Sequence, residues 1–408
     1  MEGMQHQPLR IAMLAPFGIR PKGTLSARML PLAQALVERG HTVTITAPPV
    51  HNPQDAGQRT LYAGVPVEHL ARPTLPGAPG ALQWIVALFQ QALAIRPDVL
   101  HLFKPKGYSG LAALLARITH PRLPLVVDTD DWEGRGGWND ILPYPRLAKE
   151  LFAWQERDLP RRAQAVTVAS RTLETQVWGA GVPPERVFYL PNGIRAASLP
   201  TSTVRREHSR PTLLLYTRFW EFNVPDLIIA LAAIIIHYPT ARLLVIGRGE
   251  RGEEYDMLRL AARAGIASAI DYRGWIEPDA IPAFLATADI ALVPLNDTLI
   301  NRARCSAKLL ELMAAGLPIV AGQVGQVSEY IEHQHSGLLV PPADSAALAR
   351  AILLLLEHAD LRVRLGAAAR TAVNAFRWER LVPDVEQAYY YVKSYNQPPS
   401  GVSTIPEK

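Results

Sequence analysis

The sequence predicts an α/β protein made of two doubly wound, Rossmann-like domains with a cleft between them. Short apolar runs alternate with helical patterns along the chain, and this alternation is typical of parallel sheets. A chain of 408 residues also exceeds the usual size of one domain. The alternation stops over residues 196–211, which are polar and lack periodicity, and then begins again. We therefore expect a linker there.

The first half begins as a strand–helix–strand unit. Leu9–Ala15 is apolar, Leu25–Arg39 has one apolar helical face, Gly40 suits a helix end, and Thr42–Ala47 is the next strand. Further strands are expected at Val65–Leu70, Val99–Leu102, Leu125–Val127, Ala165–Val168 and Val187–Leu190.

The second half repeats the pattern. Strands are expected at Thr212–Tyr216, Ala241–Ile246, Ile290–Val293 and Pro318–Ala321. Helices are expected at Pro225–His237, Glu253–Ala264, Ala307–Ala315, Ser345–His358, Leu361–Phe376 and Trp378–Tyr395, before a loose tail at Gln397–Lys408. We divide the chain into a domain over 1–200, a second over 211–376, and a helix over 377–396 that packs back on the first.

Composition excludes several classes of protein. Cys305 is the single cysteine, so no intrachain disulfide forms, which suits a cytoplasmic protein. No apolar run reaches the length of a membrane span, and the first residues do not resemble a signal peptide. Residues 1–195 carry 21 Lys and Arg against 15 Asp and Glu. This basic half either is a solvated surface or faces an anionic membrane or a phosphorylated acceptor. Nothing points to nucleic acid.

Two glycine turns are candidate phosphate sites. Leu14–Gly23 joins the first strand to the first helix, with Lys22 as an added cation, and Gly247-Arg248-Gly249 ends a buried strand. Glycine lets a backbone approach a ligand closely, and a helix N-terminus attracts anions. A plain tight turn explains either segment equally well. Leu14–Gly23 lacks the G-x-G-x-x-G spacing of a nicotinamide site.

The strand Leu125–Val127 is followed directly by an acidic run, Asp128-Thr129-Asp130-Asp131. It has three interpretations: ligands for a divalent cation, a contact to a sugar hydroxyl or a base, and a cap for the next element.

The stretch Lys308–Pro318 is the most informative. Lys308 and Glu311 lie three apart and so share one helical face. A carboxylate can accept two ribose hydroxyls, whereas a surface Lys–Glu pair is worth only about 0.3–0.5 kcal/mol.

Several of these segments together resemble the family-4 retaining glycosyltransferases of the GT-B fold, over about residues 9–392. The matching motifs, in the family's order, are RGHTV at 39–43, RPDVLH at 96–101, LPNGI at 190–194, KLLELMAAGLP at 308–318 and SGLLV at 336–340. The resemblance implies a GT-B architecture with the nucleotide sugar bound by the second domain.

The resemblance also assigns roles to residues. Arg218 would bind the donor diphosphate and Glu311 the ribose hydroxyls. The remaining donor-binding positions it implies are Gly23, Gly247, Gly249, Trp275 and Ile276.

Three positions depart from the family pattern. Asn223 stands where the family has a phosphate-binding lysine, Ala303 replaces the first of two glutamates, and Asp130 replaces an active-site histidine. Arg302, Arg304 and Lys308 crowd the same region, and we take them as candidates to carry the phosphate charge.

The sequence thus predicts a retaining glycosyltransferase with Asp130, Arg218 and Lys308 as catalytic residues. The nucleotide sugar is a substrate, no cofactor or metal is expected, and the donor's own phosphate would deprotonate the acceptor hydroxyl. The departures at Asn223 and Ala303 also suit a non-catalytic sugar-nucleotide binder, and the architecture suits a nucleotide-sugar epimerase. A cytoplasmic protein with peripheral membrane contact is expected.

Overall fold

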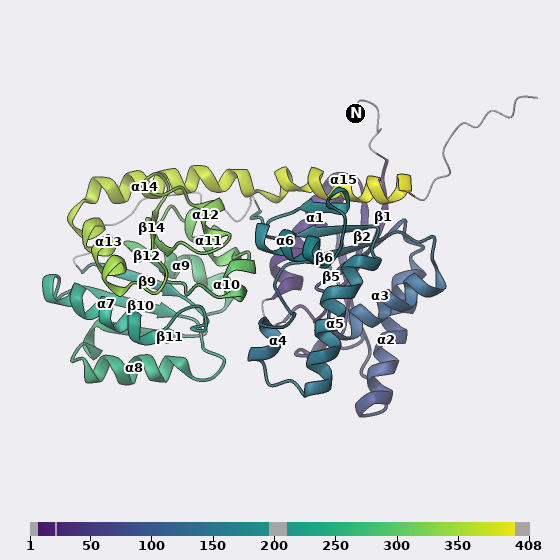
Figure 1. Ribbon diagram of the computed structural model, residues 1–408, viewed down its shortest axis with the longest axis horizontal. Helices are drawn as coiled ribbons and strands as arrows, with labels where there is room; N and C mark the ends of the chain where they lie inside the picture. The colour runs from purple at the N-terminus through teal and green to yellow at the C-terminus, as the bar shows by residue number, and fades with distance from the viewer. Residues whose placement is uncertain (1–6, 21–22, 196–209, 396–408) are drawn as a thin grey trace, which may run out of the picture. The chain divides into compact units, whose positions relative to one another are not determined.

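The computed structural model describes residues 7–20, 23–195 and 210–395 (Figure 1). The predicted linker over 196–211 lies almost wholly outside the described residues, as do Lys22 and the tail. The chain forms two compact units: Met1–Pro191 with Leu381–Lys408 is unit 1, and Asn192–Arg380 is unit 2.

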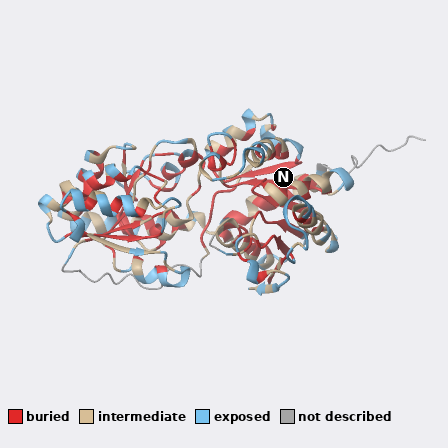
Figure 2. Cartoon of the chain, turned by 90° about the horizontal axis from the view of Figure 1, so that it is seen from below, coloured by how far each residue is buried: buried red, intermediate tan, exposed pale blue. Residues whose placement is uncertain are grey.

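Unit 1 is built on an eight-stranded sheet in the order β3-β4-β2-β1-β5-β6-β7-β8. Only β3 and β4 pair antiparallel; the other neighbours are parallel. The strands are β1 Arg10–Leu14, β2 Thr42–Ala47, β3 Arg59–Tyr62, β4 Val65–His69, β5 Val99–Phe103, β6 Leu125–Thr129, β7 Ala165–Val168 and β8 Val187–Tyr189. The central strands β5, β6 and β7 are buried throughout (Figure 2), as apolar strands covered on both faces should be.

The helices of unit 1 alternate with its strands. They are η1 Leu25–Met29, α1 Leu30–Glu38, α2 Gly77–Ala94, α3 Gly107–Thr119, α4 Trp138–Ile141, α5 Arg146–Arg162 and α6 Arg171–Gly179. Helix α1 packs on β2 and β4, whereas α2 packs on β1, β2 and α3. The Ser170 side chain accepts a hydrogen bond from Leu173 N and so caps α6, which fixes where that helix begins.

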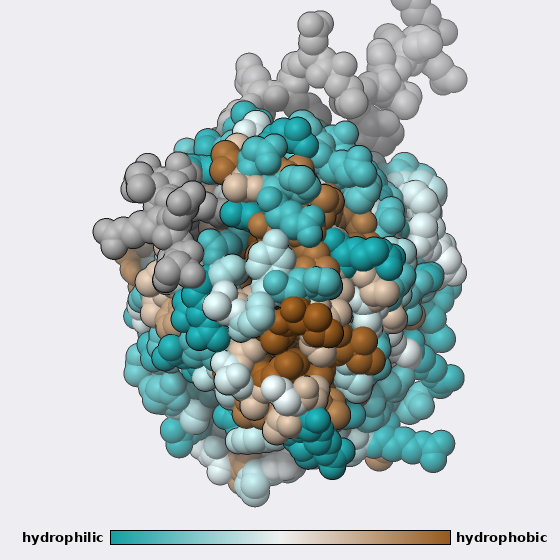
Figure 3. All heavy atoms as spheres, turned by 90° about the vertical axis from the view of Figure 1, so that its left-hand side faces the viewer, coloured by the Kyte–Doolittle hydropathy of each residue, from teal (hydrophilic) through white to brown (hydrophobic). Residues whose placement is uncertain are grey.

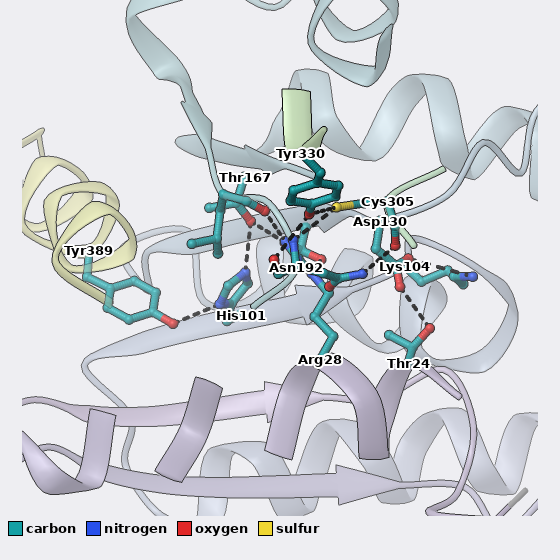
Figure 4. Close-up of polar contacts among 12 residues, drawn as sticks. Thr24, Arg28, His101, Lys104, Asp130, Thr167, Asn192, Cys305, Tyr330 and Tyr389 are labelled. Carbon is teal, nitrogen blue, oxygen red and sulfur yellow. Dashed lines mark hydrogen bonds and ion pairs between the residues drawn. The ribbon is translucent and has the colours of Figure 1, made fainter. Parts of the chain in front are cut away.

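The last helix, α15 (Trp378–Tyr395), contributes its second part to unit 1. The Tyr389 hydroxyl lies 2.8 Å from His101 Nδ1 under the sheet, and Figure 4 shows these two rings meeting. Glu386 accepts hydrogen bonds from Arg39 Nη2 at 2.8 Å and lies 2.9 Å from His41 Nε2. The RGHTV motif therefore holds the C-terminal helix.

Unit 2 has a six-stranded, wholly parallel sheet in the order β11-β10-β9-β12-β13-β14. Its strands are β9 Thr212–Tyr216, β10 Arg242–Ile246, β11 Ile270–Gly274, β12 Ile290–Val293, β13 Ile319–Gly322 and β14 Leu338–Val340. Its helices are α7 Val224–His237, α8 Glu253–Arg263, α9 Ile281–Leu285, α10 Leu299–Ala303, α11 Ala307–Ala314, α12 Val327–Tyr330, α13 Ser345–Glu357 and α14 Ala359–Ala372.

Helix α7 carries both core and surface apolar residues. Its buried face joins β9, β10 and α13 in the core of unit 2. Its outer face leaves Ile229 and Ile236 59% and 77% exposed, and Figure 3 shows apolar side chains gathered at the level of α7.

Two details differ from the sequence-based expectation. The acidic run Asp128–Asp131 begins inside the strand rather than after it, because β6 extends to Thr129 and includes Asp128. Strands β3 and β11 were not expected, since their alternate residues are only partly buried and their apolar pattern is weak.

Each sheet has one topological switch point, where the strand order reverses direction. In unit 1 it lies between β1 and β5, and in unit 2 between β9 and β12. Doubly wound sheets bind ligands outside the carboxyl ends of strands at such a switch point. We therefore sought sites there.

Candidate active site

A cavity of about 550 Å³ opens at the switch point of unit 2. Leu215–Thr217 at the end of β9 and Leu292–Leu295 at the end of β12 form two of its walls. The loop and helices that follow add Glu221, Asn301, Arg304, Ser306 and Lys308. The cavity is thus lined by both apolar and charged side chains.

The charged residues form one group around Glu221. Glu221 Oε1 lies 3.2 Å from Arg304 Nη1 and 3.6 Å from Lys308 Nζ. Glu221 Oε2 accepts hydrogen bonds from the Thr217 hydroxyl at 2.9 Å and from Arg218 N at 3.1 Å. We call Arg218, Arg304 and Lys308 with Glu221 the cation group. It carries an excess of positive charge, as an anion site requires.

The cation group perturbs its own ionisation. Burial, with smaller contributions from Arg304 and Arg218, lowers the pKa of Lys308 to about 7, while Glu221 opposes the shift. Burial alone would raise the pKa of Glu221, but Lys308, Arg304 and the Thr217 hydroxyl hold it at about 2. Glu221 therefore stays ionised, and Lys308 titrates near neutral pH.

Local sequence explains how Arg304 and Lys308 come together. Ser306 caps α11 by accepting from Leu309 N, which places Lys308 in the first turn. Cys305, between them, is tied to Asn192 of the LPNGI motif: Asn192 N donates to Cys305 Sγ at 3.0 Å and Asn192 Nδ2 to Cys305 O at 2.6 Å. The Tyr330 hydroxyl contacts both residues (Figure 4). The loop between α10 and α11 is therefore fixed.

The loop that carries Arg218 is strained and closely packed. Phe219 has φ +70° and is buried, a conformation that costs energy for a bulky residue. Gly247 has φ +117°, and a Cβ there would overlap the Thr217 carbonyl oxygen. The glycine after β10 is thus required for close packing against this loop.

Glu311 lies one turn along α11 from Lys308. Its charge acts on Lys308, and with burial it raises the pKa of Tyr216 at the end of β9. Glu311 therefore borders the cation group.

The other predicted donor-binding residues lie at the ends of β10 and β11. Gly247 N donates to Gly274 O at 2.7 Å, which places Trp275 and Ile276 beside the Gly247–Gly249 turn. Trp275 is 49% exposed. Gly249 N donates to Glu254 of α8 at 3.0 Å, so a side chain already uses this donor.

The candidate Arg302, and two of the positions that depart from the family pattern, do not line this cavity. Arg302 is exposed and pairs with Asp297, with Nη2 2.6 Å from Oδ2, so the geometry gives it no place in the cation group. Asn223 is the N-cap of α7 and lines a separate cavity of about 330 Å³. Ala303 is fully buried.

Unit 1 gathers the opposite charge at the ends of β5 and β6. Lys104 Nζ lies 2.8 Å from Asp131 Oδ2, 3.1 Å from Glu133 Oε1 and 3.6 Å from Asp130 Oδ1. Lys106 Nζ lies 2.8 Å from Glu133 Oε2. We call these five residues, together with buried Glu156, the carboxylate cluster. An ammonium group already sits among its carboxylates, where the cation interpretation would put a metal.

Asp130 lies at the edge of this cluster. Its Oδ2 accepts the Thr24 hydroxyl at 2.9 Å (Figure 4). Burial raises the pKa of Asp130 to about 6; Lys104 opposes the rise, and Asp131 adds to it. Burial and Glu133 raise the pKa of Glu156 well above its ordinary value.

Asp128 has a separate, structural role. Arg28 forms a bidentate ion pair with Asp128, with Nε 2.8 Å from Oδ1 and Nη2 2.6 Å from Oδ2. Both side chains are buried. Arg28 also donates to Leu190 O. Gly23 lies two residues before η1, and its N donates to Ser26 Oγ. Thus Asp128 pairs with a buried arginine, whereas Asp130 and Asp131 belong to the carboxylate cluster.

Sequence reasoning did not find Glu221, Lys104 or Glu156. Glu221 stands four residues after Thr217 at a strand end, and Lys104 directly follows β5. Charged residues at these strand ends were the available signal. Nothing in the helical pattern of α5 distinguishes Glu156.

The described residues offer two further findings. No group of three His, Cys, Asp or Glu side chains among residues 7–20, 23–195 and 210–395 is arranged to hold a metal ion. None of the helices within these ranges combines the length and apolar character of a bilayer-crossing segment.

A charged cavity at the switch point of a parallel α/β unit is typical of a site for a phosphorylated nucleotide. Comparison with known proteins makes the class specific. Residues 23–193 match the glycosyl transferase 4-like domain model and residues 210–358 match the glycosyl transferases group 1 model. The chain therefore belongs to the family-4 glycosyltransferases of the GT-B fold and is a transferase.

Individual relatives agree. A phosphatidyl-myo-inositol mannosyltransferase of Mycobacterium leprae is 25% identical over 93% of this chain and 96% of its own. A D-inositol 3-phosphate glycosyltransferase of Acidothermus cellulolyticus is 27% identical over 95% and 91%. Among solved structures, Anabaena HepE with UDP and glucose has a TM-score of 0.72 at 19% identity, covering 94% of this chain and 99% of HepE. This likeness confirms the fold.

Proposed function

We propose that the protein is a retaining glycosyltransferase that moves a sugar from a nucleoside diphosphate sugar to an acceptor hydroxyl. The observation that carries this proposal is the cation group at the switch point of the group 1 domain. Arg218, Arg304 and Lys308 can neutralise the charge that develops on a leaving diphosphate, usually the largest contribution to such catalysis. Because these cations can serve that purpose, no metal ion is needed in the proposal.

In the proposed reaction the bond between the sugar C1 and the β-phosphate oxygen breaks while the acceptor oxygen bonds to C1 on the same face. The acceptor proton goes to the released phosphate oxygen. Glu311 accepts the ribose hydroxyls, and Asp130 accepts a hydroxyl of the donor sugar or the acceptor.

The relatives suggest the acceptor. Two of them are named for phosphatidylinositol or inositol phosphate, which supports an inositol-type polyol here. A lipid-linked polyol would bring unit 1 to an anionic membrane. In support, residues 1–195 carry excess positive charge, and Leu147 and Leu82 are 85% and 60% exposed.

The test is a panel of UDP- and GDP-sugars offered with phosphatidylinositol vesicles or inositol 3-phosphate. We expect one donor to give a product whose anomeric configuration matches the donor, with and without a chelator. An inverted product would overturn retention, and activity that depends on added magnesium or manganese would overturn the metal-free site. Equal turnover of vesicle-bound and free acceptors would remove the membrane from the proposal.

A further inference from the structure

Lys308 occupies an unusual position for a lysine. Its side chain is 19% exposed, and its Nζ is buried without a hydrogen-bond acceptor. The nearest carboxylate oxygen, of Glu221, is 3.6 Å away, and the Tyr216 ring lies on another side at 4.9 Å. Such an ammonium group is incompletely satisfied and lines a cavity, so it can still bind an anion.

Glu221 is the feature that keeps this ammonium in place. Glu221 is only 5% exposed. The Thr217 hydroxyl and Arg218 N both donate hydrogen bonds to its carboxylate, which fixes it within the loop. Its peptide oxygen is also held, by Asn301 Nδ2 at 2.7 Å. A side chain fixed at so many points does not move aside for a ligand without disrupting the loop.

The charges around Lys308 come from four elements. Tyr216 faces it from β9, Arg218 and Glu221 from the following loop, Arg304 from the segment after α10, and Glu311 from α11 itself. Two guanidinium groups therefore oppose the proton on Lys308, and the two carboxylates favour it.

We propose that Glu221 is a positioning residue that holds Arg304 and Lys308 for the donor diphosphate, and that Lys308 binds the diphosphate only as a protonated ammonium group. Lys308 thereby supplies, from helix α11, the cation that is missing at Asn223. This inference rests on the proposed function, since it takes a nucleoside diphosphate as the ligand.

The proposal makes nucleotide binding depend on pH in a defined direction. Burial and the two guanidinium groups lower the pKa of Lys308 to about 7, so the free protein loses this proton as pH rises. A bound diphosphate raises the pKa again, and binding must then take up a proton. One obligatory proton lowers affinity about tenfold for each pH unit above the free pKa.

The experiment is titration calorimetry of UDP and GDP with the full-length protein between pH 7.5 and 8.5, in buffers of different ionisation enthalpy. For whichever nucleotide binds, we expect affinity to fall about tenfold over this range and close to one proton to be taken up. Lys308→Arg should bind with no such pH dependence, because arginine stays charged. Lys308→Met should bind weakly at every pH. Arg302→Met, which changes an exposed cation outside the cavity, should keep the wild-type behaviour.

Glu221→Gln tests the positioning role. Without the carboxylate that favours the proton on Lys308, affinity at pH 7.5 should be about tenfold weaker, and its fall should begin at lower pH. Tighter binding by Glu221→Gln would mean that Glu221 competes with the diphosphate, and would overturn the positioning role. Wild-type binding without proton uptake would overturn the role of Lys308 even if Glu221→Gln does not fold. If neither UDP nor GDP binds at any pH, the proposed function itself fails.

Discussion

The two units gather opposite charge at the carboxyl ends of their sheet strands. At the switch point of unit 2, Arg304 and Lys308 lie against one carboxylate and the charge of Arg218 acts on Lys308. At the strand ends of unit 1, two lysines lie among four carboxylates. The sheets that present them are both parallel at this point. The difference teaches that the fold fixes where ligands bind, whereas the loops after the strands decide which ligands they are. An anion suits unit 2 and hydroxyl groups suit unit 1.

The largest effect is expected from removing a cation of unit 2. Arg218→Ala should lower kcat about 10²–10³-fold, the usual cost of losing one group that stabilises developing negative charge. Its side chain is part of a group that already lacks the family lysine, so no neighbour can replace it fully. Steady-state kinetics at saturating donor measure the effect, with Arg302→Ala as the control. Equal kcat for Arg218→Ala and wild type would contradict the assignment of an anion site to unit 2.

The corresponding change in unit 1 should be smaller. Asp130→Asn should lower turnover about tenfold to a hundredfold, because a neutral amide oxygen accepts a hydroxyl hydrogen bond more weakly than an ionised carboxylate does. Burial raises the pKa of Asp130 to about 6, so the ionised form is lost as pH falls through that value. We expect kcat/KM of the wild type to decline below pH 6.

The same profile should lack this acid limb in Asp130→Asn, while its melting temperature changes little. Asp128→Asn is the matched control: it leaves Arg28 buried with half of its partner, so it should cost stability of several kcal/mol. A stable, fully active Asp130→Asn protein would show that the carboxylate cluster is structural throughout.

Glu311 should affect binding more than turnover. Glu311→Ala removes the proposed partner of the ribose hydroxyls and should weaken nucleotide binding about tenfold, within the 1–3 kcal/mol cost of an unpaired polar group. Calorimetry with UDP and GDP gives the affinity, and circular dichroism checks the fold. The side chain is only half-buried, so the fold should survive. Unchanged affinity would assign Glu311 to electrostatic support of Lys308 alone.

Sequence patterns were sufficient for most of the fold because its central strands are buried on both faces. Thr42–Ala47, Ala165–Val168, Thr212–Tyr216 and Ile290–Val293 begin and end where the apolar pattern predicts. The prediction was wrong at Asp128, since a carboxylate that ends an apolar run looks like a strand end. Its partner Arg28 lies 100 residues away, and a contact of that kind leaves no local pattern.

The sites were predictable only in part, for the same reason. Lys308 and Glu311 share a helical face, which spacing alone shows. Spacing does not distinguish Arg302 from Arg304, although they point to different surroundings: one to Asp297 in solvent, the other to buried Glu221. Their separation depends on Cys305 being anchored to Asn192, again a contact distant in sequence.

The smallest expected effect is a difference in melting temperature between one variant of each unit. Glu156 in unit 1 and Glu221 in unit 2 are both buried carboxyl groups, 4% and 5% exposed, yet their surroundings shift their pKa values in opposite directions. Burial and Glu133 raise the pKa of Glu156. Its contribution to stability is thus greatest below the unfolded pKa and is lost as pH rises. The pKa of Glu221 is lowered to about 2, so its contribution is present above the unfolded pKa and is lost only as pH falls towards 2.

At pH 8, Glu156→Gln should therefore raise the melting temperature and Glu221→Gln should lower it, each by a few degrees, given about 2–4 °C per kcal/mol for units of this size. At pH 5 the gain from Glu156→Gln should shrink, because the wild-type carboxyl then keeps its proton, whereas the loss from Glu221→Gln should remain. Scanning calorimetry at the two pH values measures both. Shifts of the same sign in the two variants would show that the two sites do not differ in charge balance as the comparison requires.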